Sequence, residues 1–305
     1  MESTVSKQKT IISYIISFAF IIVMITASVI LKDHEIILPE VAAMAIAMWV
    51  WRDEGWIRQP YKIFLVPSIT ALIGFVVNQL PISYLGKVIF TLILMIIFLW
   101  TIQSNLGPSI ATGLLPVVTN ATEWSFVISV FILTFLLMIG VLLFRLNKGL
   151  EKKTEIQYKY MAVFLVLILV WIGLCSIVGY PLAVIPPILV VVFESLQKPM
   201  YNGKMAFKQG LVLTVSATIG TLLYFSIDSW ILATLLDMIL MLILLYVVGI
   251  RVPAVYAFPL LPFVFPDEIV AKLPLGSFIT CLFLLSAVLA YKKIEMRQKG
   301  RAVQM

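Results

Sequence analysis

The sequence predicts an all-α, polytopic transmembrane helical bundle made of two parallel tandem repeats of about six membrane segments each. Hydrophobic residues make up 62% of the 305 residues and charged residues only 12%, which leaves too few polar residues to cover a soluble protein. The apolar residues also fall into runs separated by short polar breaks. Runs of about 20 such residues are what a helix needs to cross a hydrocarbon core of about 30 Å. Finally, matching residues recur at one offset between the two halves.

Six apolar segments are expected in each half. In the first half they lie near 11–31, 37–51, 63–80, 84–102, 106–119 and 125–144, and in the second near 160–178, 182–195, 209–226, 230–249, 252–265 and 275–291. The first is too long for the apolar part of a signal peptide and is interpreted as a retained helix. The chain then divides into a first repeat at 1–146, a basic linker at 147–159, a second repeat at 160–293 and a basic tail at 294–305.

The basic residues predict the orientation in the membrane. If the N-terminus is cytoplasmic, all of the 22 Lys and Arg residues except Lys32, Lys87 and Lys272 fall on the cytoplasmic side. This positive-inside bias predicts a multi-pass protein of the cell membrane with both termini and the linker in the cytoplasm. The net charge of +7 therefore sets topology and does not indicate a nucleic-acid partner. Each half must then cross an even number of times, so the repeats are parallel.

An offset of 146 residues brings residues of the two halves into alignment. The aligned pairs are Arg58 with Lys204, Lys62 with Lys208, Ala71 with Ala217, Gly74 with Gly220, and Pro116 with Pro262. Leucine matches carry no information in such an apolar chain, but Pro, Gly and basic matches at one offset do. We interpret them as a duplication.

The second and fifth segments of each half are short and carry prolines. About 14 helical residues span about 21 Å, which is less than the hydrocarbon core. Proline also frees backbone carbonyls, and non-helical backbone at membrane depth must face protein or a water-filled cavity. Such segments indicate the substrate path of a transporter, the alternative being kinks in an ordinary bundle. The candidate path residues are Pro39, Glu40, Pro108, Ser109, Thr112, Pro116, Pro186, Pro187, Pro253, Tyr256 and Pro262.

Three acidic residues lie in or beside apolar segments. Asp237 stands inside the segment at 230–249, where an Asp costs about 2.5–3.5 kcal/mol to insert. It is a candidate proton- or cation-coupling group, or else it bonds a neighbouring hydroxyl for packing. Glu40 follows a proline and is interpreted as an acid at a helix N-terminus or as part of an outer vestibule. Glu194 precedes Lys198 by four residues, which predicts an ion pair at the membrane interface.

Basic and aromatic residues gather at the predicted ends of spans. The basic set at the cytoplasmic ends is Arg58, Lys62, Lys204, Lys208 and Arg251. These residues either fix topology or form a funnel that attracts anions. The tryptophans Trp49, Trp51, Trp56, Trp124 and Trp230 are predicted to form an aromatic belt at the membrane interfaces.

The sequence offers little material for catalysis. Cys175 and Cys281 lie inside apolar runs and are interpreted as small buried residues, not a disulfide or metal site. His34 is the only histidine, and no GxxxxGK[ST] loop for a nucleotide is present. We therefore expect no enzyme activity, no metal and no cofactor.

Two stretches of the first half resemble the HPP family of integral membrane proteins. The stretch GPSIATGLLPV at 107–117 is similar to the family's His-Pro-Pro signature through Pro108, Ala111, Thr112, Leu114 and Pro116. The stretch QPYKIFLVPSITALIGF at 59–75 is similar to its Gln-Pro and Ser-Ala-Leu-Ile-Gly motifs through Gln59, Pro60, Ala71, Leu72, Ile73 and Gly74. A weaker resemblance links 204–221 to the membrane domains of fusaric-acid and aromatic-acid exporters.

The chain departs from the HPP pattern at its histidines. The signature His and first Pro are Leu106 and Gly107 here, and the family's Gly-His pair is Val66-Pro67. No histidine role is therefore carried over. The resemblance implies a small multi-pass membrane protein. Transport of an anion, nitrite, is proposed for the plant members of the family.

Together these patterns predict a transporter or permease for a small anionic or amphipathic solute that passes between the repeats. The alternative is a non-transporting membrane subunit that supports another membrane protein. The expected partners are the lipid bilayer, the solute, and a second copy of the chain or another membrane protein. A lipid-modifying enzyme fits poorly, because paired acids and histidines at membrane depth are absent from the sequence.

Overall fold

The computed structural model describes residues 7–151, 156–179 and 184–303. Parts of the predicted linker at 147–159 and the first residues of the predicted segment at 182–195 lie outside this range.

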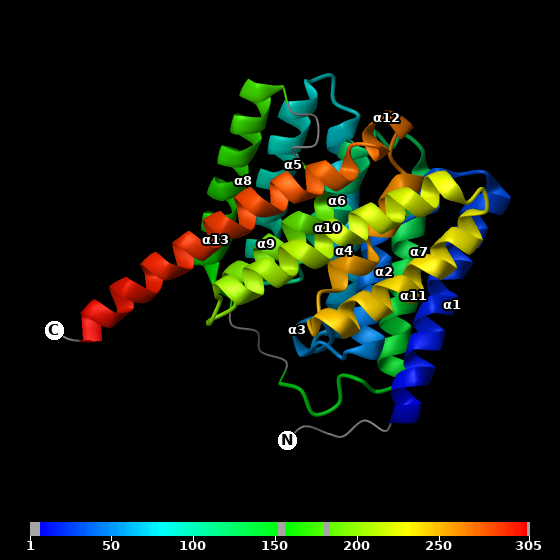
Figure 1. Cartoon of the computed structure of the whole chain (residues 1–305), viewed down its shortest axis with the longest axis horizontal. Helices are drawn as coiled ribbons and strands as arrows, with labels where there is room; N and C mark the ends of the chain where they lie inside the picture. The colour runs from blue at the N-terminus through cyan, green and yellow to red at the C-terminus, as the bar shows by residue number, and fades with distance from the viewer. Residues whose placement is uncertain (1–6, 152–155, 180–183, 304–305) are drawn as a thin grey trace.

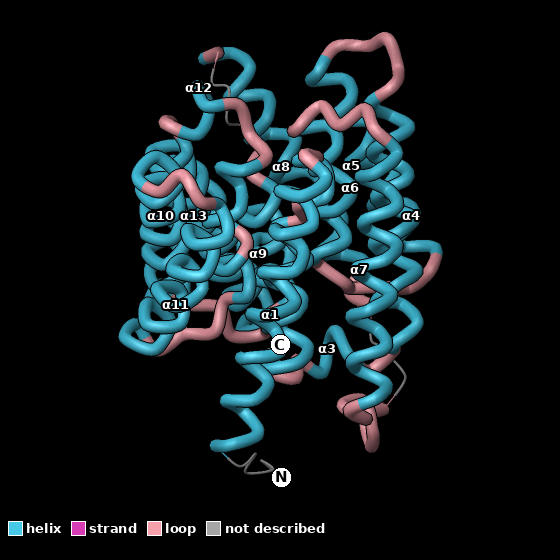
Figure 2. Tube along the Cα trace, turned by 90° about the vertical axis from the view of Figure 1, so that its right-hand side faces the viewer, coloured by secondary structure: helices cyan, strands magenta, loops and turns pink. Residues whose placement is uncertain are grey.

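Long apolar helices make up most of the described chain, which contains no strand. Eight of these helices are long and apolar enough to cross a membrane. They are α1 (Lys7–Leu31), α4 (Pro60–Asn78), α5 (Tyr84–Thr101), α7 (Trp124–Leu143), α8 (Tyr158–Val178), α10 (Gly203–Ser226), α11 (Trp230–Val248) and α13 (Leu273–Val303). In Figure 2, α4, α5 and α7 lie on the right-hand side of the molecule and α10, α11 and α13 on the left-hand side. The predicted all-α helical fold is confirmed for the described residues, and the eight apolar helices agree with a polytopic membrane protein.

Four short segments alternate with the long helices, in the second and fifth places of each half. They are α2 (Pro39–Ala45), continued by the π-helical η2 (Ile46–Val50), then α6 (Pro108–Val118), α9 (Pro186–Gln197) and the 3₁₀ pair η3 (Pro253–Tyr256) and η4 (Phe258–Phe263). The longest single helix among them has 12 residues and spans about 18 Å. The remaining short elements, η1 (His34–Ile36), α3 (Glu54–Ile57) and α12 (Asp267–Val270), lie in connections.

Proline explains why three of these segments, all except α6, start inside the protein. Leu38, Ile185 and Val252, each followed by a proline, have extended backbone. A residue before proline avoids the helical region, whereas proline itself fits the first position of a helix. All three residues are buried. The chain therefore enters the interior in an extended form and turns helical only there, which leaves little length for the helix.

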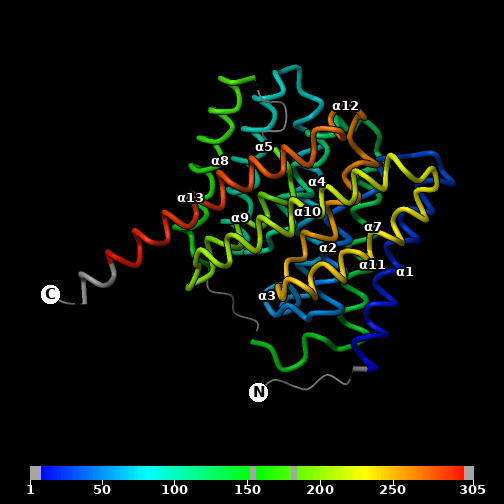
Figure 3. The backbone as a smooth tube through the Cα atoms, viewed as in Figure 1, coloured from blue at the N-terminus to red at the C-terminus, as the bar shows by residue number. Residues whose placement is uncertain are grey.

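The long helices pack in the same pattern in both halves. Helix α4 packs on α5, α6 and α7, and α10 packs on α11, η4 and α13. Between the halves, α1 packs on α11 and α8 packs on α5, as Figures 1 and 3 show. The short segments of the two halves also pack against each other, α6 on α9 and α2 on η3. Each half thus completes the core of the other.

Two glycines permit the closest contacts between long helices and short segments. A Cβ atom at Gly74 of α4 would overlap the carbonyl oxygen of Gly113 in α6. A Cβ atom at Gly220 of α10 would lie 2.5 Å from the Cα atom of Pro259 in η4. These contacts bring helix backbone directly against the short segments, where only glycine leaves enough space.

Helix α13 continues beyond the predicted end of the second repeat. The sequence places the boundary between repeat and tail after residue 293, but the helix runs without interruption to Val303. Lys292 and Glu295, on either side of that boundary, are both buried. Their ion pair offsets the loss of hydration, so the tail begins within the packed part of the molecule.

We predict that Gly74→Ala and Gly220→Ala each destabilise the protein strongly, because the backbone atoms they would meet cannot move aside. Overpacking of this kind costs about 1–3 kcal/mol or more. Gly173→Ala in α8 is the matched control, since no atom lies within 4 Å of its added Cβ. Thermal unfolding of the detergent-purified protein measures the effect. A melting temperature of Gly74→Ala equal to that of Gly173→Ala would contradict the close contact.

Candidate functional site

A small cavity lies where the four short segments meet. Its wall is formed by Glu40 and Ala43 of α2, Trp56 of α3, Pro108 and Ala111 of α6, Pro187, Val190 and Glu194 of α9, and Pro253, Ala254 and Ala257 of the η3 region. The first turn of every short segment contributes to this wall. The space open to water is about 10 Å³, roughly that of one water molecule. We call it the central cavity.

The structure brings some of the predicted path residues together here and places others in packing contacts. Glu40, Pro108, Pro187 and Pro253 line the central cavity. Pro39 precedes Glu40 in α2, and Pro186 precedes Pro187 in α9. The residues that are buried away from its wall are Ser109, Thr112, Pro116, Tyr256 and Pro262. The Thr112 hydroxyl meets that of Thr70 on α4 at 3.1 Å, and the Tyr256 ring packs against Trp51 and Phe18.

Glu40 reaches the central cavity from the second position of α2. Pro39 starts that helix, so the carboxylate stands at the positive end of the helix dipole, as the sequence suggested. The side chain is only 4% exposed. Among the described residues, no hydrogen-bond partner reaches its Oε1 atom.

Glu194 lies on the same wall, in the last turn of α9. The Trp56 indole donates a hydrogen bond to it, while its Oε1 atom has no partner in the described part of the chain. A Cβ atom placed on Gly107 would lie 3.2 Å from this Oε1, so the carboxylate sits at the start of α6. The predicted ion pair with Lys198 is wrong. Lys198 has left the helix for extended backbone, which removes the spacing that such a pair needs.

The prediction of an aromatic belt at the membrane interfaces is also wrong for two of the five tryptophans. Trp49 is buried and its indole donates to the Leu137 carbonyl of α7 at 3.3 Å, and Trp56 stands on the wall of the central cavity. Both residues lie near the ends of apolar runs, where the sequence pattern is the same for an interfacial and a buried tryptophan. Trp124, in contrast, is exposed at the start of α7.

Asp237 lies in the interior on α11 but not on the cavity wall. It is fully buried at 0% exposure, and neither carboxylate oxygen has a hydrogen-bond partner in the described chain. The alternative prediction, that Asp237 bonds a neighbouring hydroxyl group for packing, is therefore wrong. Thr91 occupies the matching place on α5, 146 residues earlier, and is buried with an unpartnered hydroxyl too.

Two residues of the predicted basic funnel hold helix ends. The Lys62 ammonium donates to the carbonyls of Ile102 at 3.0 Å and Gln103 at 2.6 Å, at the end of α5. Lys208 donates to the Val248 carbonyl at the end of α11. The last carbonyls of a helix lack intrahelical partners and attract cations. Of the remaining set, Arg58 donates to the Glu54 carbonyl at 3.1 Å, and Lys204 and Arg251 are exposed.

A larger basic pocket opens on the side of the molecule that carries the linker. Its volume is about 700 Å³, and its charged lining residues are Lys9, Arg52, Glu54, Arg145 and Lys148. These residues lie on α1, at the start of α3 and just before it, and after the end of α7. No sequence pattern groups these residues, because only the fold brings them together. We call this the basic pocket.

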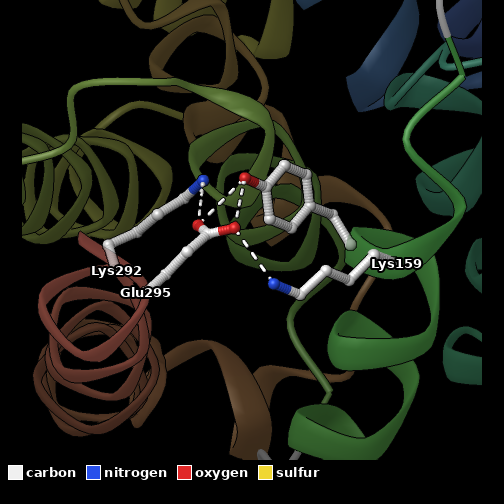
Figure 4. Close-up of polar contacts among 4 residues, drawn as sticks. Lys159, Lys292 and Glu295 are labelled. Carbon is white, nitrogen blue, oxygen red and sulfur yellow. Dashed lines mark hydrogen bonds and ion pairs between the residues drawn. The ribbon is translucent and has the colours of Figure 1, made fainter. Parts of the chain in front are cut away.

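A charged cluster joins the first turn of α8 to the second half of α13. The Glu295 carboxylate accepts hydrogen bonds from Lys159 at 3.1 Å and from the Tyr160 hydroxyl at 2.9 Å, and it pairs with Lys292 at 3.5 Å. Figure 4 shows the carboxylate between the two ammonium groups. The Lys292 ammonium also lies 3.8 Å from the centre of the Tyr160 ring. These contacts satisfy a buried lysine and fix α13 to α8.

No family model, curated protein or solved structure matches this chain. Across the residues that the structure describes, no three His, Cys, Asp or Glu side chains come together as a metal site would require. The class of protein is therefore defined by the fold itself. The chain is a multi-pass helical membrane protein, in which long apolar helices surround four short segments that meet at a cavity with two acids.

We predict that Lys62→Met and Lys208→Met lower stability to a similar degree. Each removes charged hydrogen bonds to helix-end carbonyls, which are worth about 1.5–3 kcal/mol when buried and less when partly hydrated. Lys204→Met is the control, because its side chain is exposed. Melting temperatures in detergent provide the comparison. If Lys204→Met lowered the melting temperature as much as Lys208→Met does, the contacts with the helix-end carbonyls would not be the cause of the lower stability.

We predict that Glu295→Ala destabilises the protein more than Glu268→Ala, which changes an exposed acid. The first substitution removes the carboxylate that pairs with the ammonium of Lys292, a residue only 2% exposed, and breaking a buried ion pair costs about 3–5 kcal/mol. The double variant Glu295→Ala, Lys292→Met should recover part of the loss. Thermal unfolding measures the stability of each variant. Equal melting temperatures for Glu295→Ala and Glu268→Ala would contradict the prediction.

Proposed function

We propose that the protein is a membrane transporter or permease that moves a small anionic or amphipathic solute between its two halves. The observation that carries the proposal is the convergence of the four short segments on the central cavity. Short helices that start at membrane depth, in matching places of two halves, are the usual form of a transporter's binding site.

The choice of an anionic solute rests on helix ends. Helices α6 and α9 both begin at the central cavity with a proline. The free N–H groups and the dipole at a helix start favour negative charge. The resemblance of 59–75 and 107–117 to the HPP family agrees with an anion, and the apolar remainder of the wall suits an amphipathic one.

We further propose that the halves are parallel tandem repeats. Equivalent contacts support this at the 146-residue offset, since Lys62 and Lys208 cap α5 and α11 in the same way. Gly74 and Gly220 touch α6 and η4 in the same way. Rocking of one repeat against the other could then open the central cavity to each side in turn.

Orientation and coupling complete the proposal. Both termini would lie in the cytoplasm of a cell whose plasma membrane holds the protein, so that the basic pocket would face inward and attract anions. Asp237 remains the candidate coupling acid suggested by the sequence. Because Asp237 does not line the cavity, its protonation would act indirectly, by changing how α11 packs on its neighbours.

A second candidate is a non-transporting membrane subunit. The central cavity has room for about one water molecule, which is what proline kinks packed for structure alone would leave. In that case the solute path would not exist. The protein would instead assemble with a second copy or with another membrane protein.

We predict that narrowing the cavity stops transport without unfolding the protein. Ala111→Val and Ala257→Val add two methyl groups each at equivalent places on its wall, whereas Ala162→Val adds them to an exposed site on α8. In vesicles containing the purified protein, the cavity variants should lower solute flux at least about tenfold, which corresponds to 1.4 kcal/mol in the barrier. The control should move solute like the wild type.

A panel of solutes is needed for this experiment. We suggest nitrite, nitrate, benzenesulfonate and an uncharged aromatic amide. Absence of flux for every solute, together with purification at a fixed ratio with another membrane protein, would reject the transporter and support the subunit.

A further inference from the structure

The basic pocket carries an excess of positive charge that the described chain does not balance. Its wall holds four basic side chains and one acid, namely Lys9, Arg52, Arg145, Lys148 and Glu54. Within the described residues, none of the four basic groups forms an ion pair. The neighbouring acid Asp53 does not line the pocket, and its carboxylate accepts the Gly55 N–H at the start of α3 at 2.9 Å. The charge of the wall therefore favours an anionic ligand.

Arg52 has a donor that no protein group in the described chain uses. Its Nε atom is enclosed by the protein and has no hydrogen-bond partner there. Leaving a buried donor without a partner is costly. A guanidinium presents its N–H groups as a planar fork that matches two oxygens of a phosphate group. A phosphate bound edge-on to Arg52 would supply the missing partner.

Both arginines of the pocket stand at helix ends where glycine is usual. Arg52 follows the C-cap of η2 and Arg145 follows the C-cap of α7, with φ angles of 54° and 51°. This left-handed conformation commonly ends a helix at glycine, because a Cβ atom disfavours it. Five residues other than glycine adopt it in the described chain, and the two arginines among them both line this pocket. A use for the two side chains explains why they are tolerated there.

The rim of the basic pocket continues into the surface that faces lipid. Ile12 of α1 and Phe144 at the end of α7 line the pocket and are exposed. Ile11, Ile15 and Leu143, next to them in the chain, are exposed as well. Both helices are apolar enough to span a membrane, so these side chains offer a surface for hydrocarbon chains. A small solute anion would not use that surface, whereas a lipid would.

The basic pocket also lies at the level of a headgroup. Lys9 belongs to the first turn of α1, and Arg145 lies just beyond α7. Figures 1 and 3 show the start of α1 and the chain after α7 at the lower edge of the molecule. Basic pockets between membrane helices at this level bind anionic lipid headgroups. The volume of about 700 Å³ is that of a small-molecule site.

We propose that the basic pocket is a binding site for an anionic phospholipid. The four basic side chains hold the headgroup phosphate, and the acyl chains extend along the exposed apolar residues of α1 and the end of α7. This inference does not depend on the proposed transport, because the basic pocket and the central cavity share no lining residue.

Native mass spectrometry of the detergent-purified full chain counts bound lipids and tests the site directly. Dioleoylphosphatidylglycerol is the anionic probe, and dioleoylphosphatidylcholine has the same acyl chains on a headgroup without net charge. We expect the wild type to bind the anionic lipid at least about tenfold more tightly. Equal affinity for the two lipids would contradict the proposal.

A matched pair of double variants locates the bound lipid. Arg52→Gln with Arg145→Gln should weaken phosphatidylglycerol binding at least about tenfold, because both phosphate forks are lost. Lys204→Gln with Arg251→Gln removes the same charge from exposed residues outside the pocket and should stay within about twofold of the wild type. Equal weakening in the two double variants would indicate diffuse surface charge and reject a defined site.

A second pocket variant keeps the test valid if the arginine variant does not fold. Lys9→Gln with Lys148→Gln changes two exposed lysines and leaves Arg52 and Arg145 in place. It should weaken phosphatidylglycerol binding at least about threefold. Melting temperatures without lipid identify the folded variants. Wild-type affinity in every folded pocket variant would reject the site.

Competition with glycerol 1-phosphate distinguishes a lipid from a free phosphate compound. This probe carries the phosphate group without acyl chains, so we expect it to displace phosphatidylglycerol only at concentrations at least about a hundredfold higher than the lipid. Displacement at equal concentration would reject the lipid and assign the pocket to a soluble phosphate compound. Lipid binding without solute flux in vesicles would reject only the proposed transport, and flux without lipid binding would reject only this inference.

Discussion

Backbone groups in a hydrocarbon environment must find partners within the protein, and the architecture follows from this constraint. Prolines at 39, 186 and 253 force the residues before them into extended backbone inside the molecule. Extended residues and freed carbonyls cannot face lipid, so the short segments have to be surrounded. The long helices provide that cover with one face and present apolar side chains to the membrane with the other.

The cover is supplied jointly by the two halves. Contacts of α1 with α11 and of α5 with α8 bring helices of one half beside those of the other, and each short segment packs on a short segment of the opposite half. A single half would leave one face of its own short segments open. The Lys62 and Lys208 contacts lie within one half each, at the helix ends that precede the short segments α6 and η3.

The cavity combines two opposing electrostatic features. The helix starts at Pro108 and Pro186 favour negative charge, and two buried carboxyl groups, those of Glu40 and Glu194, stand on the wall of the same cavity. Each acid has a carboxylate oxygen without a hydrogen-bond partner in the described chain, and burial of this kind disfavours the ionised form.

The sequence by itself determined the membrane class, the long spans and the short proline-marked segments, because the transfer free energy of an apolar run and the restraint of proline are local properties. It also pointed to Glu40, Pro108, Pro187 and Pro253. Only the tertiary structure decided that Glu194 and Trp56 share their cavity and that Lys62 and Lys208 hold helix ends. These contacts join residues far apart in the chain, and a single helix has the same periodicity whichever neighbour it meets.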